Sequence, residues 1–179
     1  MNKIYEKIYP SKPDEKDINI FKKIKSLSWV EPNLIIIKKY KFDRILPELI
    51  NQFKHINIVK SPYKKINYMK SIIETIQNII KFNEGEDKHV GIENVGEALN
   101  YVFIKANPNR IYSDIEFVKI FCKDNENYAN YIFTFESIYK LISNYKAESF
   151  NLNQEEYKKK CEEALNEKNE ELIDNKIIN

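Results

Sequence analysis

Glycine is scarce in this chain of 179 residues, which contains only three of them. A sheet-rich fold with many tight turns uses glycine where φ is positive, so the shortage favours a mostly helical protein. Cysteine is also rare. Cys122 and Cys161 lie 39 positions apart, without the spacing of a metal site, and we expect reduced thiols in a cytosolic protein. No apolar run approaches the roughly 20 residues of a membrane-spanning helix.

An excess of one charge is missing as well, because 29 lysines and arginines are balanced by 27 aspartates and glutamates. The net charge of +2 gives no strong field and does not indicate nucleic acid as the main partner. Lysines and tyrosines are interleaved in residues 38–41 and 62–70, a pattern that could bind RNA. Lysines on the solvent side of an amphipathic helix explain the pattern more simply.

Residues for covalent or metal chemistry are not grouped in the sequence. His55 and His89 have no histidine, cysteine or carboxylate at ligand spacing, and no glycine-rich phosphate loop is present. No pairing of a nucleophile with a histidine can be argued from spacing. We therefore expect no metal and no cofactor, and any catalysis must proceed without covalent steps.

Apolar residues instead recur every three or four positions, which is the pattern of amphipathic helices. This pattern predicts one all-α, layered domain of six to eight helices over residues 17–150. Residues 1–16 are expected to be a flexible lead-in, and residues 151–179 a polar C-terminal helix or tail. The short run Leu34 to Ile37 has no second strand to pair with, so a helix start or an extended plug is expected there.

Local signals predict several helix boundaries. Ser61-Pro62 is typical of a helix start, with a hydroxyl cap followed by proline. Asn107-Pro108 should end the helix over residues 92–106, because the residue before proline avoids the helical region. Ser113 is the expected N-cap of the next helix. The last helix, capped at Asn153, has a thin apolar stripe and could either pack as a closing helix or project into solvent.

Three segments, in order, resemble one known family. They are LNYVFIKANPNRIYSDIEFVKIF (99–121), KSPYKKINYM (60–69) and SWVEPNLI (28–35). Each is similar to a motif of the Vps-nine-type (vacuolar protein sorting) domain, which is found in guanine-nucleotide exchange factors for Rab GTPases of the early endosome. The resemblance covers residues 29–142.

The resemblance implies a layered helical domain with flanking helices, whose partner is a small Rab GTPase. It also implies a cytoplasmic protein peripheral to early endosomes or endocytic vesicles. Exchange of GDP for GTP needs no nucleophile, only preferential binding to the nucleotide-free GTPase. Most matched residues should then be structural, and the following are expected in the core: Leu99, Val102, Phe103, Ala106 and Phe121.

The resemblance also implies which residues act. In the family an acidic residue near the start of the KANP helix enters the GTPase, and that position falls on Glu93, where the family prefers aspartate. Glu97 stands where the family has proline. Acids near a helix N-terminus are also stabilising in themselves, which is the structural alternative for both.

Two positions on the following helix contact the GTPase switch regions in the family, where they are a tyrosine and a threonine. Aligning the downstream apolar face places them on Asn130 and Phe133. Sliding the alignment by one residue places them on Tyr131 and Thr134 instead. The slip restores both residue types but rotates the apolar stripe by about 100°.

Three functions follow as hypotheses. The first is an active exchange factor, with Glu93 as its acidic residue. The second is a Rab-binding scaffold with the same fold and little exchange activity, which the departures from the family pattern support. RNA binding through the lysine–tyrosine clusters is the third and weakest.

Overall fold

The structure is a computed structural model, and it describes residues 9, 12–35, 42, 44–84, 92–122 and 125–177. For residues 84, 92–93 and 167–177 it describes the backbone alone. Within these ranges the chain forms helices and loops and no strand, which confirms the prediction of an all-α fold. The elements are α2 (Glu15–Ser26), η1 (Pro32–Leu34), α3 (Leu46–Ile58), α4 (Pro62–Glu84), α5 (Ile92–Ala106), α6 (Ile111–Cys122), α7 (Glu126–Ser143), η2 (Ala147–Phe150) and α8 (Gln154–Ile177).

Polar caps set most of the helix starts. Asp14 accepts a hydrogen bond from the Lys16 amide at 2.8 Å and caps α2, which begins at residue 15. Ser61 accepts from the amide of Lys64 at 3.4 Å at the predicted start of α4. Asn153 caps α8 as predicted, accepting from the Glu156 amide at 2.8 Å.

At the corner between α5 and α6, the first helix ends where it was predicted to end, but the second helix has a different cap from the predicted one. Asn107 takes a left-handed φ of 40° after the last residue of α5, which places Pro108 outside the helix. Helix α6 begins at Ile111, so the prediction that Ser113 is its N-cap was wrong. The cap comes from α2, where Asp17 accepts hydrogen bonds from the Ser113 amide at 3.0 Å and from the Ser113 hydroxyl.

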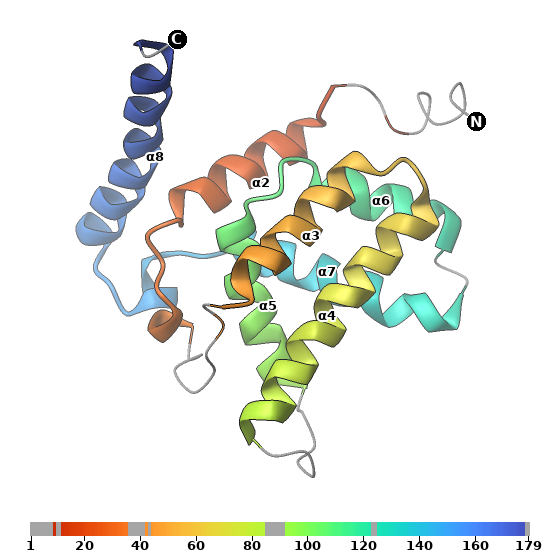
Figure 1. Ribbon diagram of the computed structural model, residues 1–179. Coiled ribbons are helices and arrows are strands. Elements are labelled where there is room, and N and C mark those ends of the chain that lie inside the picture. Colours follow the sequence, from red (N-terminus) through yellow and green to blue (C-terminus); the bar gives the residue numbers. More distant parts are fainter. Residues whose placement is uncertain are drawn as a thin grey trace.

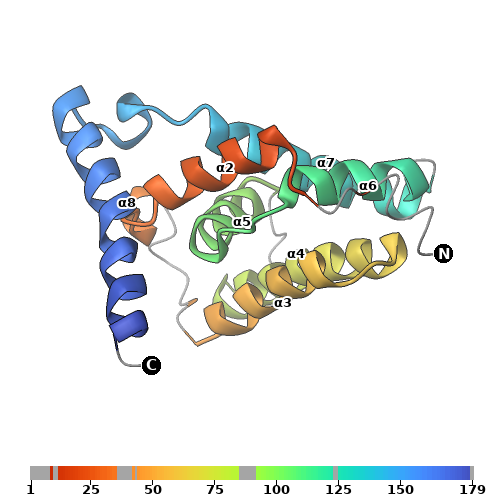
Figure 2. The ribbon, with the colours of Figure 1, turned by 90° about the horizontal axis from the view of Figure 1, so that it is seen from above.

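Helix α5 is the centre of the domain. Figure 2 shows it between a layer of α2, α6 and α7 and a layer of α3 and α4, and it contacts α2, α3, α4 and α7. Residues 98–104 of α5 are all buried, as expected of a helix that is covered on every side. Its Phe103 ring lies 5.1 Å from that of Phe53 in α3 and 5.8 Å from that of Phe135 in α7.

A buried ion pair joins α4 to α6. The Lys65 ammonium lies 2.6 Å from Asp114 Oδ1, and both side chains are fully buried. Lys65 also donates to the Ile56 carbonyl at 2.5 Å, and the Tyr9 hydroxyl donates to Asp114 Oδ1 at 2.8 Å. Burial lowers the pKa of Lys65 and raises the pKa of Asp114, and their mutual attraction opposes both shifts. Tyr9 belongs to the expected lead-in, most of which lies outside the described residues.

Helix α8 lies beside α2 at one edge of the domain (Figures 1 and 2). Trp29 packs edge-on against Phe150, with ring centroids 5.3 Å apart, and against Tyr157 of α8, at 6.3 Å. Lys23 of α2 donates to the Tyr157 hydroxyl at 2.8 Å and to the Tyr145 carbonyl at 2.6 Å. The first turns of α8 therefore pack as a closing helix.

One residue expected in the core lies at the surface. Phe121 is 41% exposed, whereas Phe117, one turn earlier on α6, is buried against Tyr9 at a ring distance of 5.4 Å. The other matched apolar residues on α5 are buried or partly buried, as expected. None of the described helices is both long enough and apolar enough to cross a membrane.

Candidate functional site

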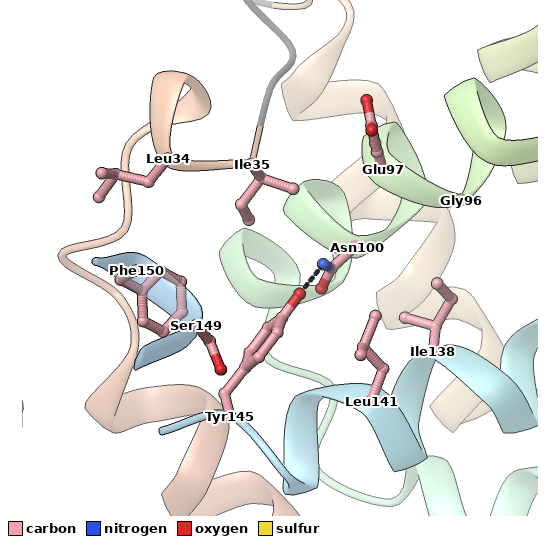
Figure 3. A pocket seen from close by; sticks show the side chains of 10 residues that line it. All are labelled: Leu34, Ile35, Gly96, Glu97, Asn100, Ile138, Leu141, Tyr145, Ser149 and Phe150. Carbon is pink, nitrogen blue, oxygen red and sulfur yellow. Dashed lines mark hydrogen bonds between the residues drawn. The ribbon is translucent and has the colours of Figure 1, made fainter. Parts of the chain in front are cut away.

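A hollow of about 360 Å³ opens between α5 and α7 (Figure 3). Gly96, Glu97 and Asn100 of α5 form one wall, and Ile138 and Leu141 of α7 form the opposite one. The rest of the lining comes from the segments around η1 and η2: Leu34, Ile35, Tyr145, Ser149 and Phe150. The lining is mostly apolar, with few polar groups, which is typical of a binding surface.

Asn100 fixes one end of this hollow. It is 2% exposed, and its amide nitrogen donates to the Tyr145 hydroxyl, as drawn in Figure 3. Its amide oxygen is buried and has no hydrogen-bond partner among the described residues. Burial raises the pKa of Tyr145, while the bond from Asn100 lowers it, so the phenol stays protonated and neutral near pH 7.

The hollow brings residues of α5 next to residues of α7. Figure 3 shows Gly96 on the side of Ile138, and Asn100 next to Tyr145. Glu93 lies one turn before Glu97, in the first turn of α5, and Thr134 lies one turn before Ile138. The side chain of Glu93 lies outside the described part of the structure.

Glu97 is on the rim of the hollow. It is half-buried, and Figure 3 shows its carboxylate pointing away from Tyr145 toward the outside of α5. The proline that the family has here would offer no charge.

The two alternative pairs on α7 differ in where they point. Asn130 is exposed and Phe133 is 71% exposed, so both side chains are accessible to a partner. Tyr131 is half-buried and packs against the core, and the Thr134 hydroxyl donates to the Asn130 carbonyl at 2.7 Å. Asn130 and Phe133 therefore form the outward face, while Tyr131 and Thr134 lie at its edge.

An ion-pair network holds α6 against α7. Glu136 lies 2.7 Å from Lys140 and 3.4 Å from Lys119 of α6, which also pairs with Glu116 at 3.0 Å. The hydrogen bond from Lys140 and the charge of Lys119 lower the pKa of Glu136. The network explains how α7 accommodates an acid between its core positions Phe135 and Ile138.

The other chemical candidates are structural or lie outside the described residues. His55 stacks on Tyr68 at 5.4 Å and bonds the Asn51 carbonyl at 2.8 Å, whereas His89 is not among the described residues. The search for metal-binding groups, which covered the described residues, found no cluster of three or more His, Cys, Asp or Glu side chains. Burial of Lys65 interrupts the basic cluster in residues 62–70, which weakens the RNA hypothesis, and residues 38–41 lie outside the described part.

The sequence did not point to most of the hollow. Gly96, Leu141, Tyr145 and Phe150 were not predicted as site residues, because they come from three segments that only the fold brings together. One signal was present: a glycine inside a strongly helical stretch costs stability and calls for a reason.

Comparison with known proteins assigns the family. The model of the Vacuolar sorting protein 9 (VPS9) domain matches residues 46–147, which is more than half of the chain, so this chain belongs to the VPS9 domain family. The match runs from the first residue of α3 to the first residue of η2 and includes both walls of the hollow.

Relatives from animals and plants agree with this assignment. A human protein named Rab5 GDP/GTP exchange factor is 25% identical over 175 residues, which cover 88% of this chain and 34% of that protein. The Vacuolar protein sorting-associated protein 9A of Oryza sativa subsp. japonica is 24% identical over 173 residues, covering 92% of this chain and 36% of the relative. The chain thus spans about a third of the length of these curated relatives.

Proposed function

We propose that this chain is a guanine-nucleotide exchange factor for a Rab5-class GTPase. The observation that carries the proposal is the VPS9 domain match over residues 46–147, in a chain whose relatives include a Rab5 GDP/GTP exchange factor. Exchange requires only that the protein bind the empty GTPase more tightly than the GDP-bound form, and the difference in affinity then promotes GDP release. We place the protein in the cytoplasm, at the surface of early endosomes or endocytic vesicles.

Glu93 supplies the acidic group in this mechanism. Its carboxylate takes the place of the departing phosphates, pairs with the phosphate-binding lysine of the GTPase and competes for the magnesium ion. The position of Glu93 in the first turn of α5 supports this role, because α5 is the central helix and is packed against four others. A carboxylate on a rigid element can be held in a defined geometry without a cost at the moment of reaction.

The remaining contacts come from the rim of the hollow and from α7. Glu97 adds a second negative charge, and Asn130 and Phe133 present an amide and an aromatic ring to the switch regions of the GTPase. Exposed aromatic side chains such as Phe133, at 71%, are favourable anchors in interfaces. Tyr131 and Thr134 line the edge of the same contact.

The second candidate is a Rab-binding scaffold that has the same fold and lacks exchange activity. The departures from the family pattern favour it: glutamate rather than aspartate at position 93, and glutamate rather than proline at position 97. The extra methylene of Glu93 moves the carboxylate by roughly 1 Å, and a misplacement of that size can cost on the order of a hundredfold in rate.

Release of a fluorescent GDP analogue from Rab5, followed by stopped flow, tests both functions. Wild type should accelerate release, and Glu93→Ala should return it to the intrinsic rate with nearly unchanged melting temperature. Glu93→Asp should be at least as active as wild type, because it restores the geometry that the family prefers. Glu155→Ala is the matched control, since Glu155 is an exposed acid in the first turn of α8.

Each outcome favours one reading. Binding of nucleotide-free Rab5 without acceleration would support the scaffold, and gain of activity in Glu93→Asp would then identify the extra methylene as the cause. If saturating protein neither binds nor accelerates any Rab5-class GTPase, both proposals are wrong. A large loss of stability in Glu93→Ala alone would mark this glutamate as structural.

A further inference from the structure

The turn that joins α3 to α4 carries two exposed hydrophobic side chains. Ile58, the last residue of α3, is 71% exposed, and Tyr63, in the first turn of α4, is 54% exposed. The same helices bury Ile56 and Ile66, so the exposed pair lies off their core faces. Figure 2 shows α3 (orange) and α4 (yellow) as one layer, with the turn at the end of that layer. We call residues 58–63 the α3–α4 tip.

Lysines accompany the hydrophobic pair. Three exposed lysines flank or belong to the tip: Lys54, Lys60 and Lys64. Lys54 lies one turn before Ile58 on α3, which places both side chains on one side of that helix. Residues 49–73 contain no aspartate or glutamate, although the chain has 27 of these acids among its 179 residues. Positive charge is therefore concentrated around the tip of a protein whose net charge is only +2.

We propose that the α3–α4 tip docks on an anionic lipid surface. Ile58 and Tyr63 enter the boundary between headgroups and acyl chains, and the lysines lie against the lipid phosphates. Burial of apolar groups and attraction of basic groups act together in binding of this kind. Tyrosine suits such a boundary because its ring is apolar and its hydroxyl is polar. The inference supplies a contact surface for the proposed placement at endosomal membranes, and it does not depend on exchange activity.

Two features favour lipid over the other partners of a basic surface. RNA would use the lysines and the tyrosine ring, but it would leave the exposed side chain of Ile58 without a role. The tip is also the end of a helical hairpin, as Figure 1 shows for α3 and α4. A lipid surface needs no complementary shape, so it accepts a projecting hairpin end.

Sedimentation of the full chain with lipid vesicles tests the inference. Wild type should bind vesicles of equal parts phosphatidylserine and phosphatidylcholine, bind pure phosphatidylcholine much more weakly, and lose binding as salt is raised. Ile58→Ala removes three carbons from the lipid contact and should weaken binding roughly five- to fiftyfold. Lys54→Glu/Lys64→Glu should weaken binding by roughly tenfold or more, since each lysine near an anionic surface contributes about fivefold.

Matched controls place the same changes elsewhere on the protein. Phe82 is 89% exposed near the other end of α4, about 28 Å from Tyr63 along the helix, and Phe82→Ala should leave vesicle binding within about twofold of wild type. Lys158→Glu/Lys159→Glu on α8 takes the net charge from +2 to −2, as the tip double variant does, because each change removes two charges. It should weaken binding several-fold less than the tip double variant. All four proteins should keep the melting temperature of wild type within about 2 °C, since the changed side chains are exposed.

Several results would overturn the inference. Wild type that fails to bind anionic vesicles would do so, and so would equal losses in the tip and control variants. RNA binding that is lost in Lys54→Glu/Lys64→Glu and kept in Ile58→Ala, without vesicle binding, would assign the tip to RNA instead. A change of self-association in Ile58→Ala, measured by sedimentation velocity without lipid, would assign the tip to a second copy of the chain.

The exchange assay keeps this inference separate from the proposed function. On soluble Rab5 without vesicles, Ile58→Ala should exchange nucleotide at the wild-type rate, because the tip contacts lipid rather than the GTPase. Wild type that accelerates GDP release and ignores anionic vesicles would refute the lipid contact alone. Wild type that binds these vesicles and neither binds nor accelerates any Rab5-class GTPase would refute the exchange function alone.

Discussion

Replacing Lys65 with methionine should be among the most destabilising single changes in this domain. The substitution keeps an unbranched side chain, one atom shorter, and removes its charge, so Asp114 is left buried without a cation. Asp114 would retain only the hydrogen bond from Tyr9, because its Oδ2 has no partner among the described residues. The carbonyl of Ile56 would lose its donor from Lys65 as well.

The expected loss is about 3–5 kcal/mol, the range for removing one partner of a buried ion pair. This is a large fraction of the 5–15 kcal/mol that typically stabilises a domain. At roughly 2–4 °C per kcal/mol for a chain of this size, the melting temperature should fall by roughly 6–20 °C. Asp114→Leu should cost a similar amount, because it leaves the Lys65 ammonium buried without its carboxylate.

The double variant Lys65→Met/Asp114→Leu gives the sharper result. Both charges are then gone, and apolar side chains of similar volume can replace a buried pair at little net cost. We expect the double variant to be more stable than either single variant. Urea unfolding, followed by circular dichroism at 222 nm (a standard helix signal) and by the fluorescence of the single tryptophan, Trp29, measures all four proteins. Losses that simply add in the double variant would show that the two groups are not coupled, and the reasoning would be refuted.

Three further predictions concern the supports of the site. Asp17→Ala should destabilise the domain by about 2–3 kcal/mol in urea unfolding, because the amide and hydroxyl of Ser113 lose their acceptor at the start of α6. Asp17→Asn should recover part of this stability. An unchanged unfolding midpoint in Asp17→Ala would contradict the capping role of Asp17. The lowered pKa of Glu136, due first to Lys140, means that its ion pairs stabilise fully above its ordinary pKa of 4.5 and are lost as pH falls through the folded value. Glu136→Gln should therefore lose up to about 1 kcal/mol at pH 7 and converge with wild type near pH 3, so a constant difference would argue against the pairing. Trp29→Ala should release α8 and speed its removal by limited proteolysis at least a few-fold, and equal digestion rates would show that the tryptophan does not hold it.

Local signals predicted the helix boundaries well where the cause is local. Ser61-Pro62 and Asn107-Pro108 act on their own backbone within a few positions, and both boundaries fall where the sequence placed them. The prediction that Ser113 is an N-cap was wrong because its helix is capped by Asp17, which lies 96 positions earlier. A cap of that kind depends on how α2 packs against α6, which the spacing of residues along the chain does not indicate.

The surface was harder to predict than the boundaries for the same reason. Phe117 and Phe121 are one turn apart on α6, so periodicity makes them equivalent, whereas in the fold Phe117 is buried and packs against Tyr9. The hollow combines segments near residues 35, 100 and 145, which share no pattern. One sequence signal of the hollow was Gly96. Glycine lowers the stability of a helix through its poor helix propensity, whatever contacts it makes.

The residues that identify the family and those that would select its partner are largely different sets. Lys65 joins α4 to α6, Lys105 donates to the Ser28 carbonyl at 2.9 Å, and Trp29 secures α8. These matched residues hold elements of the fold together. Substitutions at matched residues should therefore lower stability first and affect exchange only through it.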